Sequence, residues 1–488
     1  MQFNIPSEVL SAVRTLRDAG FGAYLVGGCV RDLLAGLEPN DWDIATQALP
    51  ERIQALFSES VYENSFGTVG VKTGSEDPRL AIVEVTTYRT EGSYTDSRRP
   101  DSVTFVERIE DDLARRDFTV NAIALDPLDE DTSTSVVDPF GGRADLARRL
   151  IRAVGDPAER FAEDALRLMR AVRLAAQLDF EIEPATLAAL TVAAPLIHSV
   201  AMERVRVELV KTLMTPRAAW GIELLRFAGI VREIIPELSE GVGVGQNKHH
   251  RYTVWEHLLK SLDYAAREGY PLSVRLAALL HDVGKPRTKQ GEGEQCTFYA
   301  HEVVGASMAK RILERLRFSE EDIARITLLV RSHMFKADEE VTEAAVRRLI
   351  RAVGAENIWE LVNLRTADRI GSGVPKAWPY RLRSYMALIE KNLREPTSLK
   401  QMVLKGDRLM ELLGIAPGPR VGWTLYALFE EVLDDPAKNT LPYLEARARE
   451  LAALSDEELQ ALAERGREEL KIALEDEEGE IRRQFGVQ

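Results

Sequence analysis

The sequence predicts an α/β domain at the N-terminus, followed by helical domains as far as the C-terminus. Within the first 140 or so residues, short apolar runs typical of strands alternate with helical patterns. From residue 144 onward, apolar residues recur almost throughout at helical spacing. The chain has 488 residues, several times the length of one typical domain, so we expect three or four packed units.

The strands of the predicted α/β domain follow from short apolar runs between turn signals. A helical pattern ends at Gly20, and Ala23–Val26 then reads as a buried strand that enters a glycine turn. Further strand-like runs cover residues 67–72, 80–87 and 118–125. The next segment, to about residue 238, is helical, and residues 252–368 are helical and carry most of the histidines. We therefore predict a head (1–140), a helical neck and body (141–250), a histidine-bearing helical domain (251–375) and a helical C-terminal region with an acidic tail (376–488).

Composition limits the partners and the compartment. The net charge of −15 argues against a general nucleic-acid coat protein, because non-specific binding to phosphates needs a basic surface. Residues 431–488 hold 16 acidic and 8 basic residues, so any bound RNA must meet basic patches upstream. Cys29 and Cys296 lie far apart without CxxC spacing, and we find no secretory leader and no apolar run of about 18 residues. We expect a cytoplasmic protein that does not enter membranes, and the oligomeric state stays open.

The first chemical signal combines glycines with paired carboxylates. The run from Gly27 to Asp32 follows a strand; glycines there let backbone amides approach a triphosphate, and Arg31 adds positive charge. Asp41 and Asp43 are two residues apart, so in an extended segment both point to one side and can hold Mg²⁺ together. A third carboxylate is usual at such sites. Glu84 is our first candidate and Asp112 the second.

Further motifs follow in a fixed order. They are the runs RRDFTVNA at residues 115–122, DPFGG at 138–142 and EDALR at 163–167. Together with the first signal they resemble the head and neck motifs of class II tRNA nucleotidyltransferases and bacterial poly(A) polymerases, in the polymerase-β-like superfamily. The resemblance covers about residues 20–215. It implies a polymerase-β-like head with a mixed sheet, followed by an all-α neck, body and tail.

Asp164, Arg167, Arg170 and Arg173 recur at three-residue steps, which places neighbours side by side on one helix. This row reads either as a salt-bridged, solvated helix face or as a protein template for a base. A carboxylate accepts from the exocyclic amine of cytosine or adenine, and a guanidinium donates to the ring nitrogen beside it. Uracil and guanine present a carbonyl at that place.

The resemblance favours the template reading. It implies that Asp164 and Arg167 read the base. It also implies that further residues contact the nucleotide, namely Gly28, Arg31, Arg116, Arg170 and Arg173.

Two other segments resemble family features. Residues 88–100 are polar, contain glycine and read as a mobile surface loop. They resemble the flexible loop of members that add the terminal A, which favours CCA or A addition over CC addition. Residues 202–209 resemble the last neck motif, to which we assign a structural role and no chemistry.

A second constellation contains most of the histidines. Its members follow the order His, His-Asp, His, His, Asp on successive predicted helices: His257, His281, Asp282, His301, His333 and Asp368. This order resembles the HD superfamily of metal-dependent phosphohydrolases. Imidazole and carboxylate ligands suit a divalent transition metal or Mg²⁺ rather than a thiolate-rich zinc site. Lys285 could neutralise a phosphate or cap a helix, whereas His198, His249 and His250 lack this context.

Our leading hypothesis is template-independent addition of C, C and A to the tRNA 3′ end from CTP and ATP, with release of pyrophosphate. Asp41, Asp43 and Glu84 would be catalytic, and the helical body would grip the tRNA acceptor end. The HD domain would add phosphodiesterase or phosphatase activity. An A-adding enzyme or a poly(A) polymerase is the close alternative. From another class, the protein could chiefly be an HD phosphohydrolase with a degenerate head.

Overall fold

The structure is a computed structural model, which describes residues 3–62, 67–92, 102–129, 135–247, 251–335, 342–394 and 402–487. The chain divides into two compact units. The first consists of Met1–His333 and Asn363–Pro375, and the second of Met334–Val362 and Lys376–Gln488. In the described part of the chain, every helix is too short or too polar to cross a membrane.

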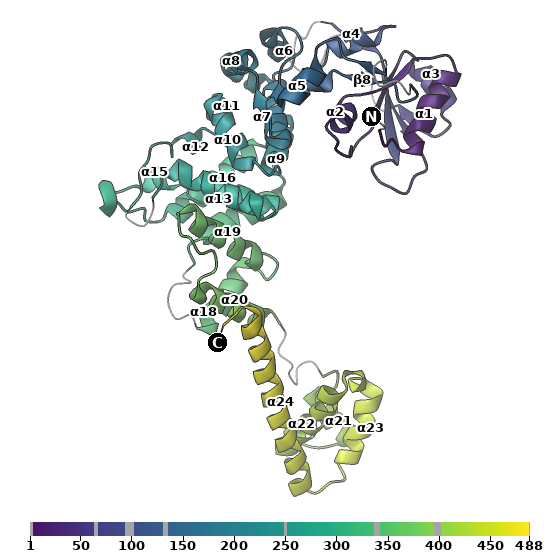
Figure 1. Cartoon of the computed structure of the whole chain (residues 1–488). Coiled ribbons are helices and arrows are strands. Elements are labelled where there is room, and N and C mark those ends of the chain that lie inside the picture. The colour runs from purple at the N-terminus through teal and green to yellow at the C-terminus, as the bar shows by residue number, and fades with distance from the viewer. Residues whose placement is uncertain are drawn as a thin grey trace. The chain divides into compact units, whose positions relative to one another are not determined.

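A mixed seven-stranded sheet forms the centre of the head (Figure 1). Its strands, in spatial order, are β3 (Ser60–Tyr62), β4 (Thr68–Lys72), β5 (Ile82–Thr87), β2 (Asp43–Thr46), β1 (Ala23–Val26), β8 (Ala124–Leu125) and β9 (Val136–Val137). The pair β2 and β5 is parallel, and the other neighbouring strands are antiparallel. The predicted mixed-sheet head is therefore confirmed.

The strands send alternate residues to two different cores. Leu25, Ile44 and Val85 pack with α1 (Ser7–Asp18), α2 (Gly28–Leu34) and α3 (Pro50–Leu56) on one face. Val26 and Ala45 pack on the other face against Ile109 and Leu113 of α4 (Ile109–Ala114). Because side chains alternate along a strand, residues 43 and 84 lie on the α4 face.

Two sequence predictions for the head are corrected. Residues 118–125 form the 3₁₀ turn η1 (Thr119–Asn121) before the short β8, not one strand. The Asp117 carboxylate accepts from the Phe118 N–H and from Asn121 Nδ2, and this local bonding turns the chain. In the predicted loop 88–100, β6 (Arg89–Glu91) pairs with β7 (Val103–Phe105). Residues 93–100 lie outside the described part.

The neck and body are helical apart from a short parallel pair, β10 (Leu150–Ile151) with β11 (Glu181–Ile182). The helices are α5 (Gly142–Arg148), α6 (Pro157–Glu163), α7 (Leu166–Leu178), α8 (Pro184–Ala193), η2 (Ala194–Ser199), α9 (Met202–Leu213), α10 (Ala218–Phe227), α11 (Ile230–Ile234) and α12 (Pro236–Ser239). Helix α7 packs against both α9 and α10, so the neck presents α7 and α9 side by side.

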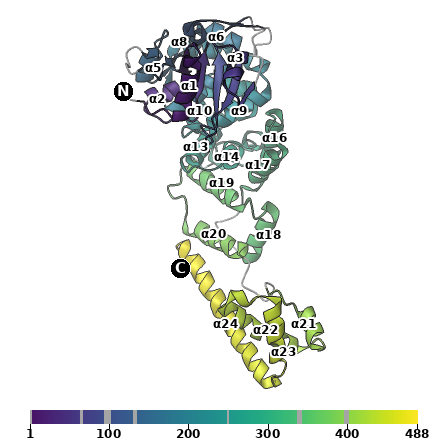
Figure 2. The ribbon, with the colours of Figure 1, turned by 90° about the vertical axis from the view of Figure 1, so that its right-hand side faces the viewer.

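The histidine-bearing domain is built from helices joined by short turns. They are α13 (Val254–Arg267), α14 (Leu272–Leu280), α15 (Lys285–Thr288), η3 (Gly293–Gln295), α16 (His301–Arg315), α17 (Glu320–Ser332) and α19 (Ile358–Gly371). Helix α14 packs between α13 and α17, and α16 packs on α17 (Figure 2). A capping box at Thr253 and Glu256 fixes where α13 begins.

The second unit is helical in its described part, as predicted for the C-terminal region. It contains α18 (Glu343–Val353), α20 (Tyr380–Leu393), α21 (Gly406–Leu413), α22 (Pro419–Asp434), η5 (Pro436–Lys438), α23 (Leu441–Leu451) and α24 (Asp456–Gln484). The long α24 packs along α22 and also contacts α20. Most of the acidic tail lies on this amphipathic helix, which buries Leu459 and Ala463.

Candidate functional site

The carboxylates of the head lie just before β2, at its first residue and on the neighbouring strand β5. Trp42 is buried in the core, whereas Asp41 is exposed and Asp43 half-buried, so the two aspartates point away from that core. In the parallel pair β2 and β5, Asp43 lies directly opposite Glu84. Partners in a parallel register point to the same face, which brings Glu84 beside Asp43. Asp41, Asp43 and Glu84 do not bring one oxygen each to within 4.8 Å of one another, the spacing that the ligand atoms of the histidine centre reach.

Gly27 leaves room for two charged groups at the end of β1. Its φ of +76° is a conformation that L side chains rarely adopt. A Cβ built there would lie 2.9 Å from Arg116 Nη1 and 3.4 Å from Asp43 Oδ2. Burial raises the pKa of Asp43, the nearby Arg116 opposes this, and Asp41 adds to it. Burial and Asp41 disfavour the ionised form of Asp43, so a cation bound beside this carboxylate would stabilise its negative charge.

Asp112, the second candidate for the third carboxylate, is directed elsewhere. It is buried and forms ion pairs with Arg115 at 2.9 Å and with Arg116 at 3.3 Å. It also accepts from the Arg89 N–H. Burial would raise its pKa, but the two arginines lower it. The arrangement suits a residue that orients Arg116, and the register favours Glu84 as the third carboxylate.

A chain of hydrogen bonds joins the glycine turn to α7. Arg31, on α2 after Gly28, donates from Nη1 to Asn121 Oδ1 at 2.9 Å. Asn121 Nδ2 donates to Asp117 Oδ1 at 3.2 Å, and Arg170 donates twice to Asp117 Oδ2, at 2.8 and 2.6 Å. Burial alone would raise the pKa of Asp117, but the Arg170 guanidinium lowers it to about 2. Arg31 and Arg170 are thus held in one network.

Asp164 does not lie on the helix that carries Arg167. It is the residue after α6, with extended dihedrals (φ −138°, ψ 103°), and α7 begins at Leu166. Its Oδ1 accepts from the Leu166 N–H at 3.0 Å, and this local bond competes with helix continuation. The predicted helical row is therefore wrong for Asp164 and right for Arg167, Arg170 and Arg173.

The side chains of the three arginines on α7 point in different directions and contact different partners. Arg167 is buried and donates to Glu163 at 2.5 Å and to the carbonyls of Arg160 and Arg115. Arg170 reaches Asp117, and Arg173 donates to Glu208 on α9 at 2.7 Å. Their directions differ because each three-residue step along an α-helix falls about 60° short of a full turn. Arg167 thus lies beside the head, and Arg173 is directed toward α9.

The histidine centre gathers its predicted ligands around Asp282. His257 and His281 place Nε2 at 3.1 and 3.4 Å from Asp282 Oδ2. His301 and His333 place Nε2 at 3.3 and 3.6 Å from the other oxygen, Oδ1. Among the described residues, groups of at least three ligand atoms within 4.8 Å of one another occur here, as two triads that share Asp282.

Asp368 completes the histidine centre. Its Oδ1 lies 3.3 Å from His257 Nε2 and 3.7 Å from His281 Nε2. Arg365 pairs with its Oδ2 at 2.7 Å, and Lys285 lies 2.6 Å from Asp282. Burial alone would raise the pKa of Asp282, but Lys285 and His281 hold it well below its ordinary value.

Backbone carbonyls orient the imidazoles for metal binding. His281, His301 and His333 each place Nδ1 within 2.9 Å of a carbonyl oxygen three residues earlier. A carbonyl can only accept, so Nδ1 carries a proton, and in the neutral imidazole Nε2 then keeps its lone pair. The Nε2 atoms of His301 and His333 lie 3.3 Å apart. Converging Nε2 atoms beside a carboxylate form a group that could hold a metal ion, and nitrogen and oxygen ligands suit a divalent transition metal.

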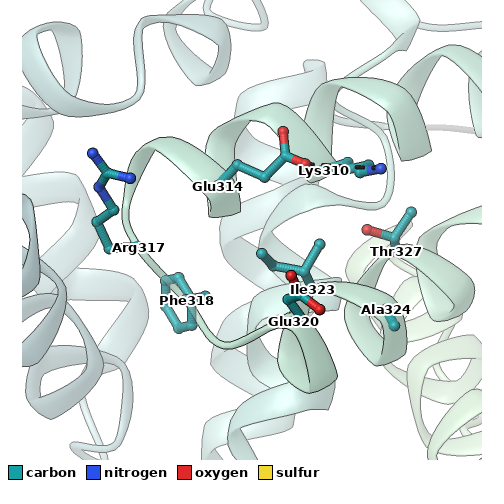
Figure 3. A pocket seen from close by; sticks show the side chains of 8 residues that line it. All are labelled: Lys310, Glu314, Arg317, Phe318, Glu320, Ile323, Ala324 and Thr327. Atoms are coloured by element: carbon teal, nitrogen blue, oxygen red, sulfur yellow. Dashed lines mark ion pairs between the residues drawn. The ribbon is translucent and has the colours of Figure 1, made fainter.

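The remaining histidines and one surface pocket lie apart from both sites. His198 pairs with Glu233 on the surface, and His249 and His250 fall outside the described residues. A pocket of about 730 Å³ lies beside the turn between α16 and α17, where Phe318 and Ile323 form its apolar wall (Figure 3). Its lining contains no histidine and none of the predicted site residues.

Sequence reasoning missed several residues that hold the site. Asp117 and Asn121 belong to the quoted RRDFTVNA run but received no role. Arg204 and Glu208 lie on α9, and they pair with Asp164 at 2.7 Å and with Arg173 at 2.7 Å. A helix rich in alternating charges was visible in the sequence. The partners were not, because Arg204 and Asp164 are 40 residues apart.

Three domain families match the chain in succession. Residues 23–152 match the poly(A) polymerase head domain, and residues 254–370 match the HD domain. Between them, residues 179–241 match a region described as the probable RNA and SrmB-binding site of polymerase A.

Relatives match over nearly the whole chain. The A-adding tRNA nucleotidyltransferase of Deinococcus radiodurans is 36% identical over 421 residues, which cover 84% of this chain and 91% of the relative. The CCA-adding enzyme of Geobacillus stearothermophilus is 34% identical over 437 residues, 88% of this chain and 94% of the relative. The crystal structure of the Bacillus stearothermophilus CCA-adding enzyme in complex with CTP superposes with a TM-score of 0.60 and 28% identity, covering 91% of this chain and 96% of that one. The chain therefore belongs to the family of class II CCA-adding tRNA nucleotidyltransferases with an HD domain.

Proposed function

We propose that this enzyme adds C, C and A to the 3′ end of tRNA, using CTP and ATP and releasing pyrophosphate. The observation that carries the proposal is the parallel register of β2 and β5, which sets Glu84 beside Asp43 on the α4 face of the head sheet. Full-length similarity to enzymes that act on the tRNA end supports the same conclusion.

The head carboxylates fit Mg²⁺ by their chemistry. Asp41, Asp43 and Glu84 offer only oxygen ligands, as Mg²⁺ prefers. When bound, the ion would activate the attacking hydroxyl and stabilise the pyrophosphate leaving group. The residues of the chain do the rest. Gly28 lets the backbone approach the phosphates, Arg31 supplies positive charge at this glycine turn, and Arg116 supplies it beside Asp43.

Base selection falls to Asp164, which lies just before α7, and to Arg167 in the first turn of that helix. An ionised carboxylate only accepts hydrogen bonds, so it accepts one from the amine of cytosine or adenine and repels the carbonyl of uracil or guanine. The guanidinium of Arg167 donates to the ring nitrogen beside that amine. Arg170 and Arg173 follow on the same helix and would contact the nucleotide. The helical body would hold the tRNA acceptor end by its shape and phosphates.

The experiment uses three tRNA substrates, which end before CCA, after C and after CC. Purified enzyme is supplied with CTP, ATP or both, and the products are resolved at single-nucleotide length. Asp43→Asn should lose addition to all three, whereas Asp77→Asn, an exposed pair with Arg79 on the head, should keep it. Full addition by Asp43→Asn would overturn the proposal.

The same substrates separate the alternatives. An A-adding enzyme extends only the tRNA that ends after CC, and a poly(A) polymerase adds A repeatedly to unrelated RNA. The A-adding relative keeps the first alternative open. The acidic C-terminal region disfavours the second, because binding diverse RNA requires a broadly basic surface.

We further propose that the HD domain is a metal-dependent phosphohydrolase for cyclic or 2′-phosphates. The supporting observation is the set of imidazole Nε2 atoms on the two oxygens of Asp282. A bound divalent metal would polarise a phosphoryl oxygen and lower the pKa of its water. Lys285 and Arg365 are the cations placed to neutralise a phosphate next to these ligands.

A phosphatase assay with 2′,3′-cyclic and 2′-nucleotides, in Mg²⁺, Mn²⁺, Co²⁺ or Ni²⁺, tests this second activity. Asp282→Ala should abolish turnover, and Asp263→Ala, an exposed ion-pair residue on α13, should retain it. Unchanged turnover by Asp282→Ala would remove the HD centre from the proposal. Hydrolysis by the wild type without any nucleotide addition would instead favour an enzyme that is chiefly a phosphohydrolase.

A further inference from the structure

Helix α9 supplies charged partners to both ends of the proposed nucleotide-reading row. Arg204 Nη2 lies 2.7 Å from Asp164 Oδ2, and Glu208 Oε2 accepts from Arg173 Nε at 2.7 Å. Residues 204 and 208 are four apart, so they lie on the same side of α9, toward α7. Arg206 points elsewhere, with its guanidinium 5.8 Å from the centre of the Phe318 ring. The helix therefore presents one side to Asp164 and α7 and another to Phe318 of the HD domain.

Asp164 depends on Arg204 for its long-range anchoring. The residue is extended and lies outside both α6 and α7, so no helix fixes its side chain. Oδ1 is held locally by the Leu166 N–H at 3.0 Å. Oδ2 is held by Arg204, from 40 residues further along the chain. Together these two bonds fix the plane of the carboxylate, while each oxygen keeps a further lone pair for a base amine.

The arginine itself gains little from this arrangement. Its second terminal nitrogen, Nη1, is buried and has no hydrogen-bond partner among the residues that the structure describes. A buried donor without an acceptor costs free energy, and such a group in a folded protein calls for an explanation. An apolar residue would join α9 to α7 without that cost. The contact with Asp164 supplies the explanation.

We propose that Arg204 is a positioning residue for base selection, which holds the Asp164 carboxylate where it accepts the amine of cytosine or adenine. This inference rests on the proposed function, in which Asp164 reads the base. Hydrogen-bond discrimination needs the acceptor to be held within a fraction of an ångström of its working position. Without Arg204 the carboxylate can swing about the Leu166 bond, and its repulsion of uracil and guanine weakens.

The test measures base discrimination by Arg204→Gln. Incorporation of CTP, UTP, ATP and GTP into a tRNA that lacks its 3′ end is followed under single-turnover conditions, with the rate and the half-saturating concentration determined separately. We expect the preference for CTP over UTP to fall about 10- to 100-fold, mainly in the rate. Arg204→Lys, which keeps a charge on Oδ2 but loses the planar fork, should restore part of the preference. Arg206→Gln, on the same helix, should retain full preference.

A double-mutant cycle shows whether Arg204 acts through Asp164. In an Asp164→Ala background, Arg204→Gln should cause no further loss of preference, because the group that it positions is already absent. Equal losses in both backgrounds would overturn the inference, as would full preference in Arg204→Gln. If Arg204→Gln does not fold, the inference stands on Arg204→Lys, and full preference in that variant overturns it.

The proposed function and this inference fail in different ways. If Asp164→Ala itself keeps the preference for CTP, the proposal that Asp164 reads the base is wrong, and the positioning role of Arg204 is wrong as well. If Asp164→Ala loses the preference and Arg204→Gln keeps it, only the inference is wrong.

Discussion

At Gly27, one added carbon would meet two groups of the proposed head site. We predict that Gly27→Ala lowers tRNA end addition by more than about 10-fold, because the new Cβ would displace Arg116, 2.9 Å away, and crowd Asp43. The positive φ should also cost about 1–3 kcal/mol of folding stability. Steady-state kinetics and a urea titration measure the two effects.

Gly36→Ala is the matched control for this substitution. Gly36 also has a positive φ, of +73°, but nothing lies within 4 Å of its Cβ position. It should lose stability and keep activity per folded molecule. Equal activity losses in both variants would show that backbone strain, and not crowding of the site, is responsible.

Substitutions at Glu84 and Asp112 test which of the two is the third carboxylate proposed for the head site. We predict that Glu84→Gln lowers the rate constant of addition about 100-fold or more, with a small change in the KM for CTP. Asp112→Asn should chiefly raise the KM, because it frees Arg116 from the pair at 3.3 Å. Rate and KM measured for both variants check this, and the reverse pattern would make Asp112 the third carboxylate.

Much of the head site could be predicted residue by residue. The two-residue spacing of Asp41 and Asp43 predicted a common side, and the burial of Trp42 between them agrees with it, although Asp41 lies in a bend before β2. The sequence predicted Glu84 as a candidate because it lies on a predicted strand. It did not predict that this strand pairs with β2, because strand pairing and register depend on contacts distant in the sequence. Arg204 could not be predicted at all, since nothing local links it to Asp164.

On the scale of elements, the ion pair between Asp117 and Arg170 joins the head to α7. Asp117 is 8% exposed, and its Oδ2 accepts two hydrogen bonds from Arg170. We predict that Asp117→Asn lowers the stability of the first unit by about 2–3 kcal/mol at pH 7. Asp179→Asn, which removes a more exposed pair with Arg217, should cost at most about 1 kcal/mol. Urea midpoints of both variants measure the difference.

The pH dependence of this difference follows from the pKa of Asp117. Arg170 lowers it from 3.8 to about 2 in the folded protein, so the stabilisation is complete above the unfolded pKa and is lost as pH falls through the folded one. The gap between wild type and Asp117→Asn should therefore be constant from pH 7 to about 4.5 and shrink below about 4. A gap that shrinks between pH 7 and 5 would contradict the pairing.

Element boundaries were predictable where packing and local bonding agree. The apolar run Ala23–Val26 is the strand β1, because both faces of the sheet are covered. Residues 118–125 look like a strand by composition, yet the Asp117 and Asn121 side chains bend the backbone into a 3₁₀ turn. Asp164 ends α6 for the same reason, since its carboxylate accepts from the N–H of Leu166, the first residue of α7.

On the scale of the whole molecule, both proposed chemical centres lie in the first unit, but they share no ligand. The carboxylates Asp43 and Glu84 belong to the head sheet, and the triads around Asp282 belong to the HD helices. Sequence order alone indicated this division, because each motif set is contiguous along the chain. What it could not indicate is that α9 contacts Asp164 of the neck through Arg204 and Phe318 of the HD domain through Arg206.

We predict that the two activities can be removed independently. Asp282→Ala should abolish phosphohydrolysis and leave CTP and ATP incorporation within about two-fold of wild type, because the ion pairs of Asp282 within the described residues join it to residues of the HD domain. Asp43→Asn should do the opposite. Both variants are assayed in parallel for tRNA end addition and for hydrolysis of a 2′,3′-cyclic nucleotide, with bound metal measured by mass spectrometry. Metal should be lost from the HD centre only in Asp282→Ala, since four imidazoles converge on that one carboxylate. A loss of tRNA addition that accompanies the loss of this metal would instead show that the HD centre supports the fold of the neck.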